Sequence, residues 1–196
     1  MRIEPTALPG VLILTPRVFA DARGRFCETW SRGRLAAAGI DLDFVQDNES
    51  LSRSPGTLRG LHYQAPPMAQ DKLVRVVAGA IWDVAVDVRR GAPSYGRWAG
   101  VELSAETGRQ LLVPAGFLHG FVTRTPDTVV SYKCSAPYAP DCDGAVHFAD
   151  PDLGIDWGID PAVAVISDKD AGAPRFRDWQ SPFAYSGPLP WEGAQA

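Results

Sequence analysis

The 196-residue sequence lacks the features of a membrane, secreted or nucleic-acid-binding protein. No apolar run approaches the roughly 20 residues that a membrane-spanning helix needs. The N-terminal MRIEPTALPG has neither the basic start nor the apolar stretch of a secretory signal, so we expect a cytoplasmic protein. The formal net charge is −4 and there is no Lys/Arg run, which argues against nucleic acid and anionic membranes as partners.

Cysteine is scarce, and long helical stretches are missing. Cys27, Cys134 and Cys142 are too few for a disulfide framework, and no Cys-x-x-Cys pair suggests structural zinc, so we expect three reduced thiols. The 19 glycines and 17 prolines are scattered and divide the sequence into short pieces. This rhythm is typical of a β-sandwich or β-barrel.

Ten short segments have the composition of strands. They are residues 11–15, 25–30, 44–48, 57–64, 73–77, 81–88, 98–103, 109–113, 120–123 and 128–134. Alternation is clearest in 81–88, where Trp82 and Val84 face one way and Asp83 and Asp87 the other, which predicts one core face. Residues 31–38, with Ser31 as possible N-cap and a glycine as the stop, are the one helix expected before the C-terminal third.

The C-terminal part differs in composition from the rest. It contains five aromatic residues in a mostly irregular segment: Phe176, Trp179, Phe183, Tyr185 and Trp191. Aromatic side chains favour packing over a free linker. We therefore expect residues 1–196 to form a single domain, with a barrel core at about 10–150 and a packing segment at about 151–196.

Polar residues are densest in three neighbouring stretches, 46–50, 57–64 and 70–75. So many hydrogen-bonding groups on strands are costly unless a ligand pairs them. Strict alternation places Gly60, His62 and Gln64 on one face of their strand and Arg59 on the other. Either Arg59 serves a different surface or Gly60 marks a β-bulge.

Several of these side chains have more than one interpretation. Taken alone, His62 could be a structural histidine or, with His119, a metal ligand. Gln64 stands where a His-x-His pair would supply its second ligand, which disfavours a metal. Lys72 could be a solvated edge lysine or reach an oxyanion, and Tyr132 could be a core tyrosine or a proton donor. Residues 168–170 look like an ordinary charged turn.

An ordered series of motifs extends from about residue 21 to residue 174. The motifs are Asp21-x-Arg23-Gly24-x-Phe26-x-Glu28, Gln46-Asp47-Asn48-x-Ser50-x-Ser52, Leu58-Arg59-Gly60-Leu61-His62-Tyr63-Gln64, Gln70-x-Lys72-Leu73-Val74-Arg75, Asp83-Val84-x-Val86-Asp87-x-Arg89, Pro114-x-Gly116-Phe117-x-His119-Gly120-Phe121, Tyr132-x-Cys134-x-x-x-Tyr138-x-Pro140, Asp150-Pro151 and Ser167-x-Lys169-Asp170. With them the sequence resembles the dTDP-4-dehydrorhamnose 3,5-epimerase family, whose fold is an antiparallel, cupin-like jelly-roll β-barrel. It departs from the family at Leu118, where alanine is usual, and at Gly158, where proline is usual.

The resemblance implies four catalytic residues. His62 would be the general base, oriented by Asp170, and Tyr132 the acid on the opposite face of the sugar. Lys72 would stabilise the oxyanion. No nicotinamide or metal would be required, and the absence of a Gly-x-Gly-x-x-Gly fingerprint agrees with this.

The resemblance also implies a set of substrate-binding residues: Arg23, Phe26, Glu28, Gln46, Asn48, Arg59, His119 and Tyr138. Arg59 would pair with the diphosphate and Tyr138 would stack on the nucleobase. The first three would come from a partner subunit, which implies a homodimer with shared active sites.

The implied function is epimerisation of a dTDP-4-dehydro-6-deoxyhexose at C3 and C5, by proton abstraction next to the C4 ketone, in deoxysugar biosynthesis of the dTDP-rhamnose type. Such a proton is far less acidic than imidazolium, whose reference pKa is about 6.5, so the enolate must be stabilised. Two alternatives stay open: a C3-only epimerase of a related nucleotide sugar, and a non-catalytic sugar-nucleotide binding module.

Overall fold

The computed structural model describes residues 1–192. Its strands are β1 (Arg2–Pro5), β2 (Leu12–Thr15), β3 (Val18–Asp21), β4 (Gly24–Cys27), β5 (Gln46–Ser52), β6 (Leu58–Gln64), β7 (Lys72–Ala78), β8 (Ala80–Asp87), β9 (Trp98–Ser104), β10 (Gln110–Val113), β11 (Phe117–Thr123), β12 (Thr128–Cys134) and β13 (Asp143–Ala145). The α-helices are α1 (Arg32–Ala37) and α2 (Asp168–Ala171), and the short 3-10 helices are η1 (Pro140–Cys142), η2 (Pro161–Val163) and η3 (Phe176–Asp178).

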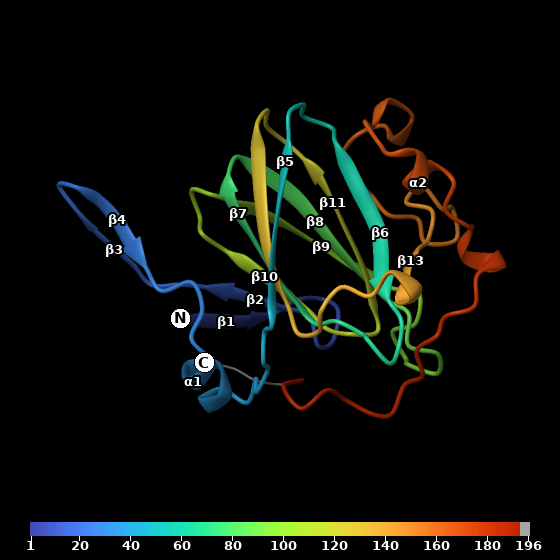
Figure 1. Cartoon of the computed structure of the whole chain (residues 1–196), viewed down its shortest axis with the longest axis horizontal. Coiled ribbons are helices and arrows are strands. Elements are labelled where there is room, and N and C mark those ends of the chain that lie inside the picture. Colours follow the sequence, from blue (N-terminus) through green and yellow to red (C-terminus); the bar gives the residue numbers. More distant parts are fainter. Residues whose placement is uncertain (193–196) are drawn as a thin grey trace.

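Within residues 1–192 the strands form two large antiparallel sheets and a separate hairpin (Figure 1). The six-stranded sheet has the order β1-β2-β10-β7-β12-β5, and the five-stranded sheet has the order β13-β6-β11-β8-β9. Strands far apart in the sequence are neighbours, such as β5 and β12, which is typical of a jelly roll. The predicted all-β, antiparallel jelly-roll fold is confirmed.

The main core lies between the two sheets. Val74 of β7 packs there with Ile81 and Ala85 of β8, and none of the three is exposed. Val84 and Val86 of β8 point to the other side, where they belong to a second buried cluster. The predicted core face of β8 is confirmed, and the opposite face, which was not predicted to be core, is buried as well.

Asp83 and Asp87 lie on the inner face of β8 and are fully buried. Each has a partner: His119 Nε2 lies 2.7 Å from Asp83 Oδ1, and Arg89 Nη2 donates to Asp87 Oδ2 at 2.6 Å. A buried carboxylate is tolerated when it is paired in this way. Alternation alone would have placed both aspartates toward solvent.

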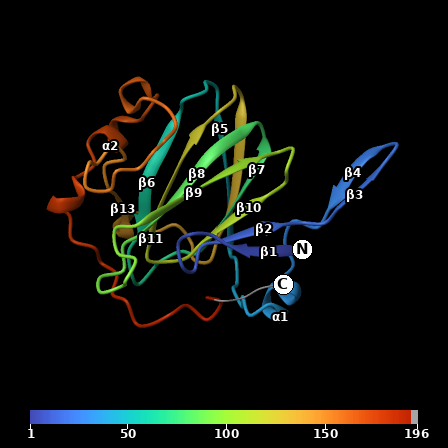
Figure 2. The same ribbon diagram turned by 180° about the vertical axis from the view of Figure 1, so that it is seen from behind.

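The C-terminal segment covers the outer face of the five-stranded sheet. Figure 2 shows it in orange and red, passing beside β6 and β13. Phe148, Trp157 and Phe183 pack there in one cluster with Val84 and Val86. All three side chains are at most 7% exposed, and Phe176 and Trp179 pack against the same cluster. The sheet is therefore buried on both faces, and the aromatic tail packs as predicted.

The outer face of the six-stranded sheet has its own cover. Leu35 of α1 and Trp191 near the end of the described chain pack on Leu12 and Leu112. Trp191 Nε1 also donates to the carbonyl oxygen of Gly10 at 2.9 Å. The helix predicted at 31–38 is confirmed, although the Ser31 side chain makes no capping hydrogen bond.

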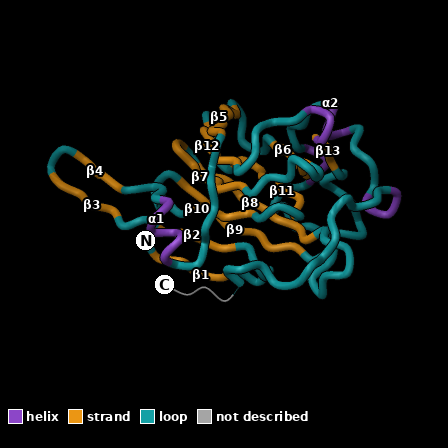
Figure 3. Tube along the Cα trace, turned by 60° about the horizontal axis from the view of Figure 1, so that its bottom comes forward, coloured by secondary structure: helices purple, strands orange, loops and turns teal. Residues whose placement is uncertain are grey.

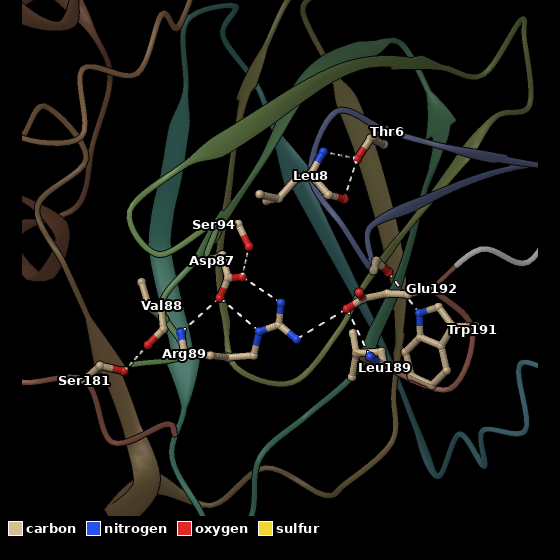
Figure 4. A network of polar contacts seen from close by, with 11 residues as sticks. Thr6, Leu8, Asp87, Val88, Arg89, Ser94, Ser181, Leu189, Trp191 and Glu192 are labelled. Carbon is tan, nitrogen blue, oxygen red and sulfur yellow. Dashed lines mark hydrogen bonds and ion pairs between the residues drawn. The ribbon is translucent and has the colours of Figure 1, made fainter. Parts of the chain in front are cut away.

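A buried arginine, Arg89, connects the end of the C-terminal segment, around Tyr185 and Glu192 and called the strap below, to the barrel. Figure 4 shows Arg89 between Asp87 and Glu192. Its guanidinium carbon lies 4.6 Å from the ring centroid of Phe117 and 5.2 Å from that of Tyr185. The strap is thus anchored to the base of β11 by one charged side chain with several partners.

The hairpin β3–β4 projects away from the rest of the molecule (Figures 1 and 3). The strand predicted at 25–30 ends at Cys27 and pairs with β3 alone, so its assignment to the barrel was wrong. Phe19 and Phe26 on this hairpin are 51% and 70% exposed. These two aromatic side chains therefore belong to no core within the described part of the chain.

Cys27, Cys134 and Cys142 are unpaired, as predicted. Among residues 1–192, no helix is both long enough and apolar enough to cross a membrane.

Candidate active site

A cavity of about 400 Å³ opens between the two sheets at the end where α2 lies. Its walls include His62 of β6, His119 of β11, Lys72 of β7 and Tyr132 of β12. An adjoining chamber of about 290 Å³ is lined by Gln46, Asn48, His62, Tyr63, Gln64, Gln70, Lys72, Tyr132, Tyr138 and Asp143. Three of the predicted catalytic residues line both spaces, so the two chambers form one site.

A β-bulge brings Arg59 and His62 to the same cavity. His62 pairs with His119 and Arg59 with Phe121, so two residues of β6 oppose one residue of β11. The bulge lies at Gly60, whose φ is +142°. A Cβ at this position would lie 2.6 Å from the Cα of Gly120, so only glycine fits. Of the two predicted alternatives for Arg59, the bulge is confirmed.

His62 is bonded to a buried carboxylate. Its Nε2 lies 2.6 Å from Oδ1 of Asp170, which is 4% exposed, whereas the imidazole itself is 32% exposed. Asp170 also receives the peptide N–H of Gly60 at 3.5 Å. Burial acts to raise the pKa of Asp170, but the hydrogen bond and charge of His62, together with the hydrogen bonds of Gly60 and Ser167, outweigh burial and hold this pKa below its ordinary value. The carboxylate is therefore ionised and fixes the ring.

Asp170 reaches this position because the chain after β13 returns to β6. The peptide N–H of Leu58 donates to Val165 at 2.9 Å, and that of Val165 donates to Gly56 at 3.0 Å. Ser167 then caps α2 by accepting the N–H of Asp170 at 3.2 Å. The charged turn expected from the residues alone is this short helix, and the pairing of His62 with Asp170 follows from the long-range contact.

Lys72 has no carboxylate within ion-pair distance among residues 1–192. Burial lowers its pKa, and the negative potential of Cys134, Asp143 and Asp83 opposes that shift only in part. Its Nζ lies 6.0 Å from the ring centroid of Tyr132. An unneutralised ammonium in a cavity is suited to attract an anionic ligand.

Tyr132 comes from the six-stranded sheet and His62 from the five-stranded sheet, so they line the cavity from opposite walls. The phenol makes no hydrogen bond within residues 1–192. Burial raises its pKa, with a smaller contribution from Cys134, and Arg59 opposes the shift. Tyr132 therefore stays protonated and has a proton to give.

His119 forms a second histidine–carboxylate pair in the cavity, with Asp83. This imidazole is 9% exposed, and the second carboxylate oxygen, Oδ2, is buried without a partner among the described residues. The imidazole is less exposed than that of His62, and His119 lines the first chamber but not the second.

Arg59 and Ser50 add two polar side chains to the lining of the first chamber. Arg59 Nε donates to Ser52 Oγ at 3.3 Å, and Nη2 donates to the carbonyl oxygen of Leu51 at 3.3 Å, which leaves Nη1 for a ligand. Ser50 Oγ is buried and has no partner within residues 1–192. Sequence reasoning gave Ser50 no role, although it lies in the motif that holds Gln46 and Asn48.

Gln46, Asn48 and Tyr138 line the second chamber. Gln46 accepts the peptide N–H of Tyr138 at 2.8 Å, and its amide donates to Asn48 at 3.0 Å. The Tyr138 side chain is 58% exposed. An ion pair between Asp143 and Lys169, which sequence reasoning missed, borders both chambers.

Arg23, Phe26 and Glu28 lie outside this chain's own cavity. The first two line a hollow on the projecting hairpin. Glu28 pairs with Arg34 at 3.1 Å. Of the twelve predicted site residues, these three are the ones that the fold does not bring together with the others.

The described part of the chain has no set of side chains suited to hold a metal ion. Residues 1–192 contain no group of three His, Cys, Asp or Glu side chains that could hold a metal ion. His62 and His119 are each bonded to a carboxylate instead. The departures from the family at Leu118 and Gly158 lie away from both chambers, since Leu118 packs on the outer face of β11.

Comparison with known proteins supports the resemblance. The family described as dTDP-4-dehydrorhamnose 3,5-epimerase matches residues 5–178. A dTDP-4-dehydrorhamnose 3,5-epimerase of Sinorhizobium fredii is 47% identical over 187 residues, which are 94% of each chain. The crystal structure of a Legionella pneumophila 3,5-epimerase in complex with dTDP-4-keto-L-rhamnose is 40% identical and superposes with a TM-score of 0.90 over 94% of this chain and 98% of that one. A 3'-monoepimerase of Streptomyces bikiniensis in complex with dTDP-quinovose is 37% identical, with a TM-score of 0.82 over 89% and 87%.

Proposed function

This chain belongs to the dTDP-4-dehydrorhamnose 3,5-epimerase family, and on that premise we propose which of its residues carry the reaction. The enzyme is an isomerase that inverts C3 and C5 of a dTDP-4-dehydro-6-deoxyhexose, next to the C4 ketone, in dTDP-rhamnose-type biosynthesis. The observation that supports the residue assignment best is that His62 and Tyr132 line one cavity from opposite sheets.

His62 is the general base. The carboxylate of Asp170 occupies Nε2, so Nδ1 is the nitrogen available to remove a proton from carbon. Because Asp170 is ionised, it stabilises the imidazolium that forms when the proton is taken. The proton goes from carbon to Nδ1, and the electron pair of the C–H bond moves onto the C4 oxygen as an enolate.

Lys72 stabilises that enolate oxygen. An ammonium without a neighbouring carboxylate, in a cavity largely shielded from water, interacts strongly with a charge that develops during the reaction. Loss of one such donor lowers kcat by about 10²–10³. His119, held by Asp83, lies on the same cavity wall as His62 and contacts the sugar.

Tyr132 returns a proton to the face opposite the one that His62 deprotonates. Inversion needs this second group, because a base that removes and returns a proton on the same face restores the starting configuration. The Tyr132 hydroxyl is protonated and makes no hydrogen bond within residues 1–192, so it can act as the acid.

The nucleotide extends from the first chamber, which Arg59 lines, into the second, which Tyr138 lines. Arg59 pairs with the diphosphate through its free Nη1, which explains how a chain of net charge −4 binds an anionic ligand. Tyr138 stacks on the nucleobase, and Gln46 and Asn48 line the same chamber as Tyr138.

The hairpin β3–β4 completes the active site of a partner subunit in a homodimer. It projects from the molecule and carries Arg23 and the exposed Phe26, which have no neighbours in their own chain's cavity. A dimer found by analytical sedimentation would support this assignment, and Phe26→Ala should then raise KM in the partner's site. A fully active monomer would contradict it. The cytoplasmic location also stays a prediction.

The decisive experiment is incubation with dTDP-4-dehydro-6-deoxyglucose in deuterated water, with deuterium at C3 and C5 measured by NMR. We expect label at both carbons with the wild type and at neither with His62→Ala. Label at C3 alone would assign the chain to C3-only epimerases, such as the 3'-monoepimerase to which it is similar. Tight binding without any exchange would instead indicate a binding module.

A further inference from the structure

The loop of residues 135–139 is irregular, yet the structure fixes it at every residue. It connects β12 to η1 and carries Tyr138, whose ring is 58% exposed. Loops of this kind are usually held by contacts within themselves or by few contacts at all. Here the hydrogen bonds come from side chains of other segments.

Each loop residue is hydrogen-bonded to a side chain from another segment, and Gln64 bonds two of them. The backbone N–H of Tyr138 donates to Gln46 at 2.8 Å, that of Ala139 donates to Gln64 at 2.9 Å, and Gln64 Nε2 donates to the carbonyl oxygen of Pro137 at 3.0 Å. Gln70 Nε2 donates to the carbonyl oxygen of Ala136 at 2.7 Å. Ser135 Oγ donates to Asp71 at 2.9 Å, and its own backbone N–H donates to the Asp71 carbonyl at 3.0 Å.

Gln64 is the centre of this arrangement. It is 5% exposed and uses every hydrogen-bonding atom of its amide: Nε2 donates to both Met68 and Pro137, and Oε1 accepts from Ala139. A carboxylate could not donate to the two carbonyl oxygens, and an imidazole could not make all three contacts. Because no N–H is left over, Gln64 cannot donate to a ligand and acts through the loop.

We propose that Gln46, Gln64 and Gln70, which we name the glutamine clamp, are positioning residues that hold Tyr138 ready for the nucleobase. The inference rests on the proposed function, in which Tyr138 is the stacking platform. An exposed aromatic ring on an unrestrained loop would have to be ordered when the nucleotide binds, which weakens affinity. The clamp orders the loop before binding, so its effect falls on nucleotide affinity and not on the proton transfers at the sugar.

The test is Gln64→Ala, with dTDP binding measured by calorimetry and turnover measured with dTDP-4-dehydro-6-deoxyglucose. We expect Kd for dTDP and KM to rise about tenfold, with kcat at saturating substrate within about twofold of the wild type. A merely structural loss would lower the active fraction, and therefore kcat, and leave KM unchanged.

Two further variants separate positioning from general damage. Thr128→Val is the matched control: Thr128 is unexposed, donates to Thr125 at 2.7 Å and lies at the far end of β12 from the loop, so its KM should not change. Tyr138→Ala provides a double-mutant cycle, and Gln64→Ala should add nothing to KM in that background.

Additive effects of Gln64→Ala and Tyr138→Ala, or an unchanged KM, would overturn the clamp. If Gln64→Ala does not fold, the half-buried Gln70→Ala is read by the same criteria. A wild type that neither binds dTDP nor exchanges deuterium would refute the proposed function itself, whereas a normal wild type with a normal Gln64→Ala refutes the clamp alone.

Discussion

His62 and His119 are directly paired residues of β6 and β11, yet their imidazoles bind different buried carboxylates. Asp170 lies 2.6 Å from the first and Asp83 lies 2.7 Å from the second. The two rings differ in access, since His62 is 32% exposed and His119 is 9% exposed. Only the more open ring lines both chambers, which is why we assign the base to His62.

This assignment predicts unequal effects of removing the two carboxylates. Asp170→Asn places a neutral amide beside Nε2 of His62, and an amide does not stabilise the imidazolium form of that histidine. We therefore expect kcat to fall about 10²- to 10⁴-fold with little change in KM. Asp83→Asn should lower kcat much less, because His119 contacts the sugar without taking the proton. Steady-state kinetics on both variants, with circular dichroism to confirm folding, make the comparison. Equal losses of kcat would refute the choice of His62.

Tyr132→Phe separates proton removal from inversion. The substitution keeps the ring that packs beside Lys72 and removes only the hydroxyl. We expect deuterium to enter the substrate, because His62 still exchanges its proton with solvent, while product with inverted configuration falls at least about 10²-fold. NMR distinguishes labelled substrate from labelled product. Product formation at the wild-type rate would show that another group is the acid.

Much of the fold could be predicted because strands and glycines leave local signals. The strand predicted at 128–134 coincides with β12, and one of the two alternatives for Arg59 was the bulge at Gly60 that places it in the cavity. The predictions failed where long-range pairing, which the local pattern does not reveal, decides the position of a segment. The strand at 25–30 has the composition of a barrel strand but lies in the projecting hairpin, because no local signal states which strand it will pair with.

The candidate site was harder to predict than the sheets. Asp170 is 108 residues from His62 in sequence and reaches it only because the segment around Val165 adds to the start of β6. The alternation of apolar and polar residues also predicted that Asp83 faces solvent. Asp83 is buried instead, and its hydrogen bond with His119 offsets the cost of that burial. Both contacts are set by tertiary structure, so the residues alone left them open and the family resemblance supplied the first.

Gly60→Ala should damage both stability and catalysis. A Cβ would lie 2.6 Å from the Cα of Gly120 and 3.1 Å from the carbonyl oxygen of His119, and neither is a flexible side-chain end. The φ of +142° adds backbone strain for any residue with a side chain. We expect the free energy of unfolding to fall by about 2–4 kcal/mol, measured by urea denaturation. Gly56→Ala is the control, since its positive φ of +76° comes with open space for a Cβ, and it should cost less.

The pH dependence of kcat should report Lys72. Burial lowers the pKa of this lysine below its ordinary 10.5, so the ammonium that stabilises the enolate is lost as pH rises through that lowered value. Tyr132 does not share this limb, because its pKa is raised above 10.0. We expect kcat to decline on the alkaline side at a pH below that of free lysine. In Lys72→Arg, which stays charged, any residual activity should lack this decline, and an identical alkaline limb would assign it to another group.

Lys72→Met should make the protein more stable while it removes activity. Burial of the ammonium in this cavity destabilises the folded state, and that cost is fully present below the lowered pKa, where both the folded and the unfolded chain are protonated. Between the lowered pKa and 10.5 the unfolded chain binds a proton that the folded chain does not, so the free energy of unfolding of the wild type rises with pH across this window.

Methionine carries no charge and has a similar length, so the Lys72→Met variant should exceed the wild type in Tm at pH 7, by about 2–4 °C for each 1 kcal/mol of relieved cost. The difference should shrink as pH approaches 10.5. Calorimetry at several pH values measures it, and a variant that is less stable than the wild type at pH 7 would show that Lys72 has a stabilising partner in the apo cavity.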